Sequence, residues 1–300
     1  MYDEFRYYRF GLKLGIANLV ENHLALGLKK TVGKIAQPVN SFTRFPEYFF
    51  MESSMRERLT RGCRVLDVGS PKLFGFYLAS HYPVELHLTD ISQDDIAEYE
   101  LLWRSVRHSV GEVSFAVQDA RRLSYPDNYF DMVYSMSVVE HVEGTDGDRE
   151  AIREMMRVLK PGGRLVVSVP AGSHYTEQYR IGLKSAAIRT AGHDRHFFQR
   201  IYDSHALRQR LTSDSDPGFL VSIFRQHSGL TRRYSAMSEN LRGLLGFLTP
   251  LVSRAVNRHQ IGSIPDQPCH YGQVFTSRDV YGDVIFCGRK PIQSVRSSYL

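Results

Sequence analysis

From Cys63 onward, short apolar segments alternate with longer amphipathic ones, and this alternation restricts the possible fold more than any other feature. The pattern predicts strands at Arg64–Val68, Val84–Thr89, Val113–Val117, Phe130–Ser135 and Arg164–Val169. It predicts helices between them at Leu73–His81, Gln93–Val106 and Ala151–Val158. Strands that alternate with helices favour right-handed crossovers. We therefore expect an α/β fold with a doubly wound, mostly parallel sheet and helices on both faces.

The regions on either side of this central part show different patterns of apolar residues. Residues 1–60 hold no convincing strand, and Leu12, Ile16 and Leu19 recur at helical spacing, so an N-terminal helical cap is predicted, with breaks at Pro38 and Pro46. Residues 61–300 are expected to form the α/β domain, with its core motifs in 63–170 and a helical insertion at about 228–275. The later elements are a helix at Ser204–Leu211 and strands at Phe219–Phe224 and Asp283–Cys287, which bring the sheet to seven strands.

Composition narrows the class of protein and of partner. Three scattered cysteines show neither a disulfide framework nor metal-ligand spacing, which favours a reducing cytoplasm. Asp3 and Glu4 argue against a secretion signal, and the apolar stretches at Gly11–Leu28 and Leu241–Val256 are interrupted too often to span a membrane. The net charge of +6 is modest. No nucleic-acid partner is expected; peripheral membrane contact stays open, and oligomeric state is undetermined.

Three carboxylates fall at the ends of successive predicted strands: Asp67, Asp90 and Asp119. In a doubly wound sheet, ligands bind at the carboxyl ends of the strands. An acid after the second strand can accept hydrogen bonds from both ribose hydroxyls of a nucleoside. An acid after the third strand can accept a hydrogen bond from an adenine amino group, and an acid near the first turn can hold an ammonium group. These features suit a nucleoside joined to an amino acid. They favour S-adenosylmethionine over NAD, whose pyrophosphate needs a closely approaching glycine-rich turn.

The same segments resemble the class I (Rossmann-like) S-adenosylmethionine-dependent methyltransferases, in particular the small-molecule branch. The resemblance covers about residues 60–170 and rests on Val65-Leu66-Asp67-Val68-Gly69, Asp90, Asp119-Ala120, Pro126–Val133, Val138-Val139-Glu140-His141-Val142 and Leu159-Lys160-Pro161-Gly162-Gly163. It implies methyl transfer from S-adenosyl-L-methionine to a small-molecule or lipid-linked acceptor, with oxygen as the expected acceptor atom. The implied cofactor-binding residues are Asp67, Gly69, Ser70, Asp90, Ile91, Asp119, Ala120 and Ser135.

Acceptor chemistry points to a second group of residues. Methyl transfer depends on holding the acceptor in line with the methyl group, and a general base is needed only for a weakly acidic acceptor such as a hydroxyl. His141 is the candidate base and Glu140 its companion; both have structural roles as the alternative. His174, Tyr175 and His193 are candidate substrate contacts. His193, Asp194 and His196 lack a fourth ligand at sensible spacing, so no metal is expected.

One departure from the family falls in the first turn. Pro71 and Leu73 stand where the family usually has glycine, and proline fixes φ and removes an N–H donor. Lys72 between them either meets the cofactor carboxylate or is exposed. We expect retained cofactor binding. The alternative is a non-catalytic, methyltransferase-like protein that binds S-adenosylmethionine. A nucleotide-sugar or NAD-dependent enzyme would need the glycine-rich phosphate turn that this chain lacks.

Overall fold

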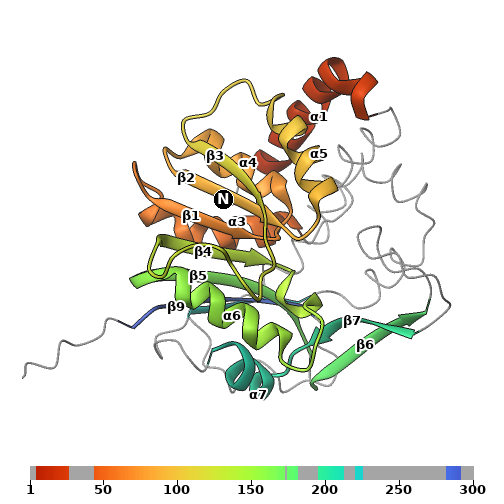
Figure 1. Cartoon of the computed structure of the whole chain (residues 1–300), viewed down its shortest axis with the longest axis vertical. Helices are drawn as coiled ribbons and strands as arrows, with labels where there is room; N and C mark the ends of the chain where they lie inside the picture. Colours follow the sequence, from red (N-terminus) through yellow and green to blue (C-terminus); the bar gives the residue numbers. More distant parts are fainter. Residues whose placement is uncertain are drawn as a thin grey trace, which may run out of the picture.

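A seven-stranded sheet forms the centre of the protein. The computed structural model describes residues 5–26, 44–172, 174–181, 195–212, 220–225 and 282–291. The strand order across the sheet is β3-β2-β1-β4-β5-β9-β8 (Figure 1). The strands are β1 Arg64–Val68, β2 Glu85–Asp90, β3 Glu112–Val117, β4 Phe130–Met136, β5 Leu159–Ala171, β8 Leu220–Arg225 and β9 Gly282–Arg289. β9 alone runs opposite to the other six strands, so the predicted doubly wound, mostly parallel seven-stranded sheet is confirmed.

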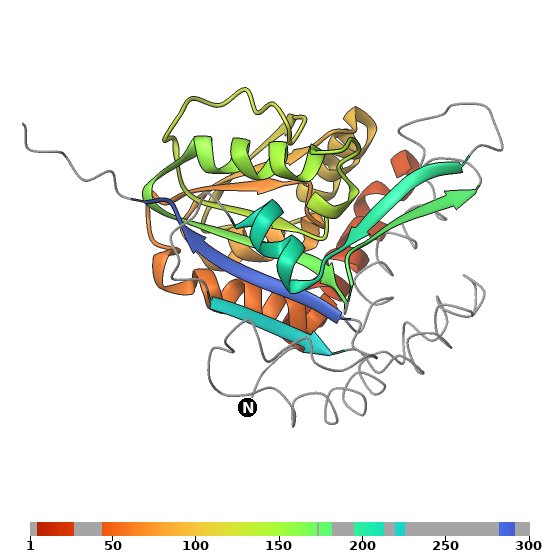
Figure 2. The same ribbon diagram turned by 90° about the horizontal axis from the view of Figure 1, so that it is seen from below.

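Helices cover both faces of the sheet (Figure 2). One face carries α1 Phe5–Leu26, α3 Arg44–Met55, α4 Lys72–His81 and α5 Gln93–Trp103, and the other carries α6 Gly147–Val158 and α7 Ser204–Ala206 with the π-helical turn Leu207–Leu211. Side chains alternate between the faces: Val65 joins the cluster under α4, whereas its neighbour Leu66 joins the cluster under α6. Because strands buried on both faces bury consecutive residues, they read in the sequence as continuous apolar runs.

The N-terminal helices are tied to the sheet by a buried carboxylate. Glu52 of α3 is 1% exposed and accepts hydrogen bonds from Arg6 and Tyr7 of α1, from Tyr82 after α4 and from Arg56. The short 3-10 helix η1, Arg56–Arg58, follows α3. These contacts fix α1 and α3 on the α4 side of the sheet. Whether residues 1–60 form a separate unit stays a prediction.

Two predicted breaks turned out differently. The segment Lys160–Gly163, predicted as a turn before the fifth strand, lies inside β5, where pairing with β4 jumps from Leu159 to Arg164. Backbone hydrogen bonds of Gly162 and Gly163 with Lys290 keep these extra residues beside the chain that leaves β9. Pro46, predicted to break the helices, is the third residue of α3; the first turn of a helix tolerates proline because its N–H groups have no partner there. Pro38 and the predicted insertion at 228–275 lie outside the described residues.

A β-hairpin is formed by segments for which the sequence pattern predicted no strand. β6 Thr176–Ile181 and β7 Arg195–Ile201 pair antiparallel as a second, two-stranded sheet that projects beside the main one (Figures 1 and 2). Their sequences are rich in polar and charged residues and lack a clear apolar alternation. Pairing between segments so far apart leaves no local signal, so periodicity missed them. Within the described ranges, no helix is long and apolar enough to cross a membrane.

Candidate functional site

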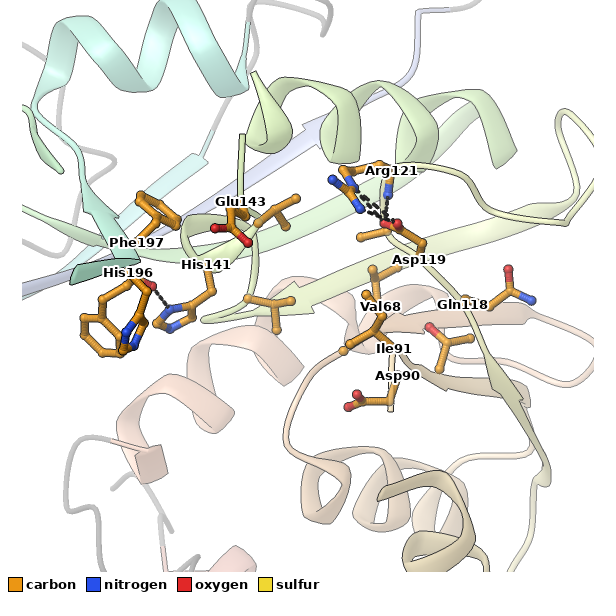
Figure 3. Close-up of a pocket in the computed structure, with 16 residues that line it drawn as sticks. Val68, Asp90, Ile91, Gln118, Asp119, Arg121, His141, Glu143, His196 and Phe197 are labelled. Carbon is orange, nitrogen blue, oxygen red and sulfur yellow. Dashed lines mark hydrogen bonds and ion pairs between the residues drawn. The ribbon is translucent and has the colours of Figure 1, made fainter. Parts of the chain in front are cut away.

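A cavity of about 450 Å³ opens at the carboxyl ends of β1, β2 and β3, beside the loop after β4 (Figure 3). This is the position at which doubly wound sheets bind ligands, and the volume falls within the usual range for small-molecule sites. The cavity is lined by Val68, Gly69, Thr89, Asp90, Ile91, Gln118, Asp119, Ala120, Arg121, Val138, His141, Val142, Glu143, His196, Phe197 and Phe198. It therefore combines five of the eight predicted cofactor residues with the predicted base.

The first turn brings backbone close to the cavity through Gly69. This residue has φ +70°, and a Cβ built on it would lie 2.8 Å from Val138 Cγ1. A side chain at this position is therefore excluded by both conformation and space. The Gly69 N–H donates to Thr89 O at 3.0 Å, which fixes the turn to the end of β2.

Ser70 and Ser135, the two serines among the predicted cofactor residues, support this turn by hydrogen bonds on the side away from the cavity. Ser70 Oγ accepts from the backbone N–H of Met136 at 2.9 Å, and Ser135 Oγ donates to Val68 O at 2.9 Å. Both serines are buried and neither lines the cavity. They link the first turn to the end of β4, and their predicted contact with the cofactor stays a prediction.

Asp67 is also behind the cavity wall, and Lys72 is its partner. The Asp67 side chain is 0% exposed, and the Lys72 ammonium lies 2.9 Å from its Oδ2. Burial raises the pKa of the Asp67 carboxyl above its ordinary value, while the attraction of Lys72 and the hydrogen bond from Ser70 oppose that rise. The alternative that Lys72 is exposed is wrong, because its side chain is 1% exposed. Lys72 does not line the cavity, and a contact with the cofactor carboxylate stays a prediction.

Asp90 and Ile91 lie at the open end of β2. Asp90 Oδ1 accepts a hydrogen bond from the Ser92 N–H at 3.1 Å, and the side chain remains 18% exposed at the cavity. Ser92 in turn caps α5 by accepting from the Asp95 N–H. Ile91 is 60% exposed and lines the cavity, so it offers an apolar surface there. A carboxylate beside an apolar surface is a suitable site for a nucleoside.

Asp119 after β3 is held by Arg121, which the sequence did not single out. The Arg121 guanidinium approaches the carboxylate in a bidentate arrangement, with Nη2 2.7 Å from Oδ2 and Nε 3.0 Å from Oδ1. The Arg121 backbone N–H also donates to Oδ1. The Arg121 hydrogen bonds hold the pKa of Asp119 below its ordinary value. Asp119 is therefore an oriented, ionised acceptor at the cavity beside Ala120, as an adenine-binding position requires.

His141 ends the short 3-10 helix η2, Val139–His141, that follows β4. Its Nδ1 lies 2.6 Å from the backbone oxygen of Phe198, and because a carbonyl can only accept, Nδ1 carries the proton. Its Nε2 lies 3.6 Å from Oε1 of Glu140, which is 2% exposed. A proton accepted at Nε2 would therefore face a buried carboxylate. The geometry suits a general base whose protonated form is stabilised by charge.

The predicted substrate residues have different positions. His174 is exposed and Tyr175 is half-buried, and neither lines the cavity. Tyr175 instead donates to Glu177 at 3.1 Å and packs against Tyr202. His193 lies outside the described residues. Their substrate roles stay predictions.

Strand β7 supplies a wall that the sequence located only in part. His196 and Phe197 lie on the His141 side of the cavity, opposite Asp90 and Asp119 (Figure 3). Phe198 also lines the cavity, and its backbone oxygen contacts His141. In the sequence these three residues belong to a polar and aromatic segment, Gly192-His193-Asp194-Arg195-His196-Phe197-Phe198. This composition is the sequence feature that could have identified them as cavity residues.

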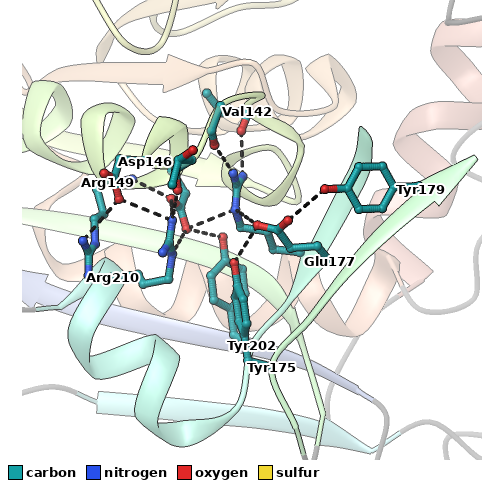
Figure 4. A network of polar contacts seen from close by, with 12 residues as sticks. Val142, Asp146, Arg149, Tyr175, Glu177, Tyr179, Tyr202 and Arg210 are labelled. Atoms are coloured by element: carbon teal, nitrogen blue, oxygen red, sulfur yellow. Dashed lines mark hydrogen bonds and ion pairs between the residues drawn. The ribbon is translucent and has the colours of Figure 1, made fainter. Parts of the chain in front are cut away.

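A network of polar contacts that includes Val142, Tyr202 and Arg210 lies beside this wall (Figure 4). Within it, Arg200 of β7 joins the wall to the loop that carries His141. Its side chain is 1% exposed, and its guanidinium donates to the backbone oxygens of Val142, at 2.7 Å, and Gly144. It also lies 4.6 Å from the ring centre of Phe197. One buried cation on β7 thus fixes both the loop after β4 and an aromatic side chain of the cavity.

Asp148 at the start of α6 completes the network around Arg200. It is 0% exposed and accepts from Arg210 at 2.7 and 2.8 Å and from the Tyr202 hydroxyl at 2.9 Å. Burial opposes ionisation of Asp148, but hydrogen bonds from Arg210 and the charge of Arg200 lower its pKa. The hairpin, α6 and the π-helical turn are therefore held together by ionised groups.

Comparison with known proteins agrees with this architecture. Residues 66–167 match the family model described as a methyltransferase domain. Phosphoethanolamine N-methyltransferase from Triticum aestivum is 34% identical over 115 residues, which cover 37% of this chain and 21% of that protein. The ubiquinone/menaquinone biosynthesis C-methyltransferase UbiE from Pseudomonas paraeruginosa is 47% identical over 72 residues, 23% of this chain and 27% of that protein. The matched segments thus span only a fifth to about a quarter of these relatives.

Similarity to solved structures is weaker, with TM-scores below 0.5. The [4+2]-cyclase SpnF is 22% identical, with 82% of each chain covered and a TM-score of 0.47. Phosphoethanolamine N-methyltransferase 2 from Haemonchus contortus is 16% identical, with 81% of this chain and 53% of that chain covered and a TM-score of 0.47. Residues 66–167 thus match a methyltransferase domain, and the mostly parallel sheet around them is the one expected for the class I S-adenosylmethionine-dependent methyltransferases.

The residues of the cavity fit S-adenosylmethionine, the cofactor of this class. Gly69 gives the close backbone approach, and Asp90 and Asp119 present carboxylates at the ends of neighbouring strands. Glycine-rich phosphate contacts are absent from the turn after β1, where Ser70, Pro71 and Lys72 follow Gly69. Among the described residues there is no group of three or more histidine, cysteine, aspartate or glutamate side chains that could hold a metal ion.

Proposed function

We propose that this protein is an S-adenosylmethionine-dependent methyltransferase that methylates a small-molecule or lipid-linked acceptor, at an oxygen atom. The observation that carries the proposal is a single cavity with Asp90 and Asp119 on one side and His141 on the other. Such a cavity brings a nucleoside-binding half and a proton-accepting half within reach of one bound pair of ligands. Placement of two reactants in line is the main source of rate in such a transfer.

The nucleoside half of the site would hold the cofactor. Asp90 would accept hydrogen bonds from the ribose hydroxyls, and Asp119, oriented by Arg121, would accept from the adenine amino group. Ile91 would cover an apolar face of the nucleoside. When bound, S-adenosylmethionine supplies a methyl group on a positively charged sulfur.

Oxygen is proposed as the acceptor atom because of the His141 and Glu140 geometry. A hydroxyl must lose its proton as it is methylated, whereas a neutral amine can attack through its lone pair. His141 would take that proton at Nε2, and Glu140, with Oε1 3.6 Å from Nε2, would stabilise the resulting imidazolium. The hydrogen bond from Nδ1 to Phe198 O keeps the ring in the tautomer that can accept there. The names of the relatives attribute N-methylation and C-methylation to those proteins.

The proposal is tested by two measurements on the whole chain. Calorimetry should detect binding of S-adenosylmethionine, and mass spectrometry of acceptor pools incubated with isotope-labelled cofactor should detect a labelled product. The Asp90→Asn/Asp119→Asn variant should lose binding, because both carboxylate acceptors are removed. Failure of the wild-type protein to bind S-adenosylmethionine would reject the function.

The altered first turn favours a second candidate, a non-catalytic protein that binds S-adenosylmethionine. Its supporting observation is that Pro71 and Leu73 stand where the family usually has glycine, with the buried Lys72 between them. Binding without any labelled product, from acceptor pools that a known methyltransferase does label, would favour this candidate.

A reducing, cytoplasmic location is part of the proposal. It is supported by the thiols of Cys63 and Cys287, which are free and buried.

A further inference from the structure

Lys72 and Asp67 form a charge pair beneath the cavity. The Lys72 ammonium lies 2.9 Å from Asp67 Oδ2 and donates to Ser70 O at 2.7 Å. The other carboxylate oxygen, Oδ1, accepts from the Ser70 N–H at 3.1 Å. Both oxygens of Asp67 are thus engaged by groups of the chain. With side chains 1% and 0% exposed, the pair is sealed from solvent and from the cavity.

The altered turn explains how the lysine reaches this place. Pro71, with φ −57°, is the N-cap of α4, and Lys72 is the first residue of the helix. Its side chain folds back beneath the turn toward Ser70 rather than out to solvent. The ammonium also lies 3.8 Å from Asp90 Oδ2 and 5.5 Å from the ring centre of Tyr99. It is therefore enclosed by β1, β2, α4 and α5.

This arrangement changes the charge that a ligand meets. Asp67 was assigned from the sequence to hold the ammonium of the cofactor's amino-acid end, but that carboxylate already has an ammonium against it. A second ammonium brought to Asp67 would lie beside Lys72, and like charges repel strongly where water is excluded. The uncompensated negative charge of this group of three is then on Asp90, which lines the nucleoside half of the cavity.

We propose that Lys72 takes the place of the cofactor's α-ammonium at Asp67, so that this protein recognises S-adenosylmethionine through its nucleoside and tolerates loss of the ammonium. The inference rests on the proposed function and refines it, because it concerns which part of the cofactor the protein recognises. Lys72 and Asp67 act as positioning residues that hold the turn and Asp90 in place. The predicted specificity extends to adenosyl thioethers that carry a carboxylate without an amino group.

The test compares two ligands by calorimetry: S-adenosylhomocysteine and its deamino analogue, in which hydrogen replaces the α-amino group. A site that pairs the ammonium with a carboxylate should lose roughly 10- to 150-fold in affinity with the analogue, the usual contribution of a hydrogen bond between charged groups. For this protein we expect the two dissociation constants to differ by less than about fivefold, well below that range. A loss of more than about 30-fold, inside that range, would overturn the inference.

A matched double variant provides the control. Asp67→Asn/Lys72→Met removes both charges together, which a buried pair tolerates far better than removal of one. The ratio of the two dissociation constants should be the same in this variant as in the wild-type protein. If the wild-type ratio exceeds the ratio of the double variant by about tenfold or more, Asp67 does bind the ammonium of the ligand. A tenfold difference corresponds to the loss of one hydrogen bond between charged groups. Thermal denaturation checks that the variant is folded, and the wild-type comparison decides alone if it is not.

Asp90→Asn separates the inference from the proposed function. It should weaken both ligands by the same factor, because Asp90 is assigned to the ribose that they share. A variant that weakens only S-adenosylhomocysteine would place the ammonium at Asp90 and overturn the inference while leaving the function intact. If neither ligand binds the wild-type protein, the proposed function fails and the inference fails with it.

Discussion

Replacement of Arg200 by methionine tests how the hairpin is attached to the rest of the protein. Methionine keeps an unbranched apolar side chain but removes the guanidinium that donates to the backbone oxygens of Val142 and Gly144. Asp148 does not become an unpaired buried charge, because Arg210 and Tyr202 still donate to it. The hydrogen bonds lost are therefore the two to backbone carbonyls of the loop after β4.

The magnitude follows from those two contacts. A hydrogen bond from a charged donor contributes about 1.5–3 kcal/mol, and Arg200 Nε, at 3.8 Å from Asp148 and 3.7 Å from Glu177, adds no hydrogen bond of its own. Desolvation of the arginine, which is 1% exposed, offsets part of this gain. We expect Arg200→Met to lower the free energy of unfolding by about 3 kcal/mol, which corresponds to a fall in Tm of roughly 5 °C for a chain of 300 residues.

Urea denaturation followed by circular dichroism measures this change, with an unaltered m value as the sign that only stability has shifted. Arg149→Met is the matched control in the same network. The Arg149 side chain is 38% exposed and its partner Asp146 is 51% exposed, so their 3.2 Å pair should contribute less than about 1 kcal/mol. Equal effects of the two substitutions would refute the assignment of Arg200 as the buried attachment of the hairpin.

Three further substitutions test the turn, the base and the charge network. Gly69→Ala should cost at least about 1–2 kcal/mol of stability, because φ is +70° and the new Cβ would lie 2.8 Å from Val138; thermal unfolding unchanged from wild type would contradict this. His141→Asn should lower the rate of methyl transfer by roughly 10²- to 10⁴-fold with a much smaller effect on cofactor affinity, and equal losses in both would argue for a structural histidine. Because the folded-state pKa of Asp148 is lowered, its contribution to stability is complete above its unfolded pKa of about 3.9 and is lost as pH falls through the folded value. The stability difference between wild type and Asp148→Asn should therefore be constant near neutral pH and shrink below about pH 4; a difference that does not change with pH would refute the lowered pKa.

The cofactor half of the site could largely be predicted from the sequence. Asp90 and Asp119 each follow a strand, and the carboxyl ends of parallel strands meet at one edge of a sheet, so local patterns were enough to bring them together. The acceptor half could not be predicted in the same way. Phe198 contacts His141 across 57 residues of chain, through a hairpin whose pairing has no local signature.

What the sequence determined by itself was the class of fold, the order of its motifs and the identity of the carboxylates at the strand ends. These depend on interactions between residues near in the chain: the period of apolar positions, the conformational limits of Gly69 and Pro71, and the position of each acid after its strand. The tertiary structure alone decided which charges face the ligand. Asp67 has the motif position of a binding residue, but burial and the Lys72 ammonium remove it from the cavity. Burial and pairing depend on what the rest of the chain packs around a residue, so no local pattern specifies them.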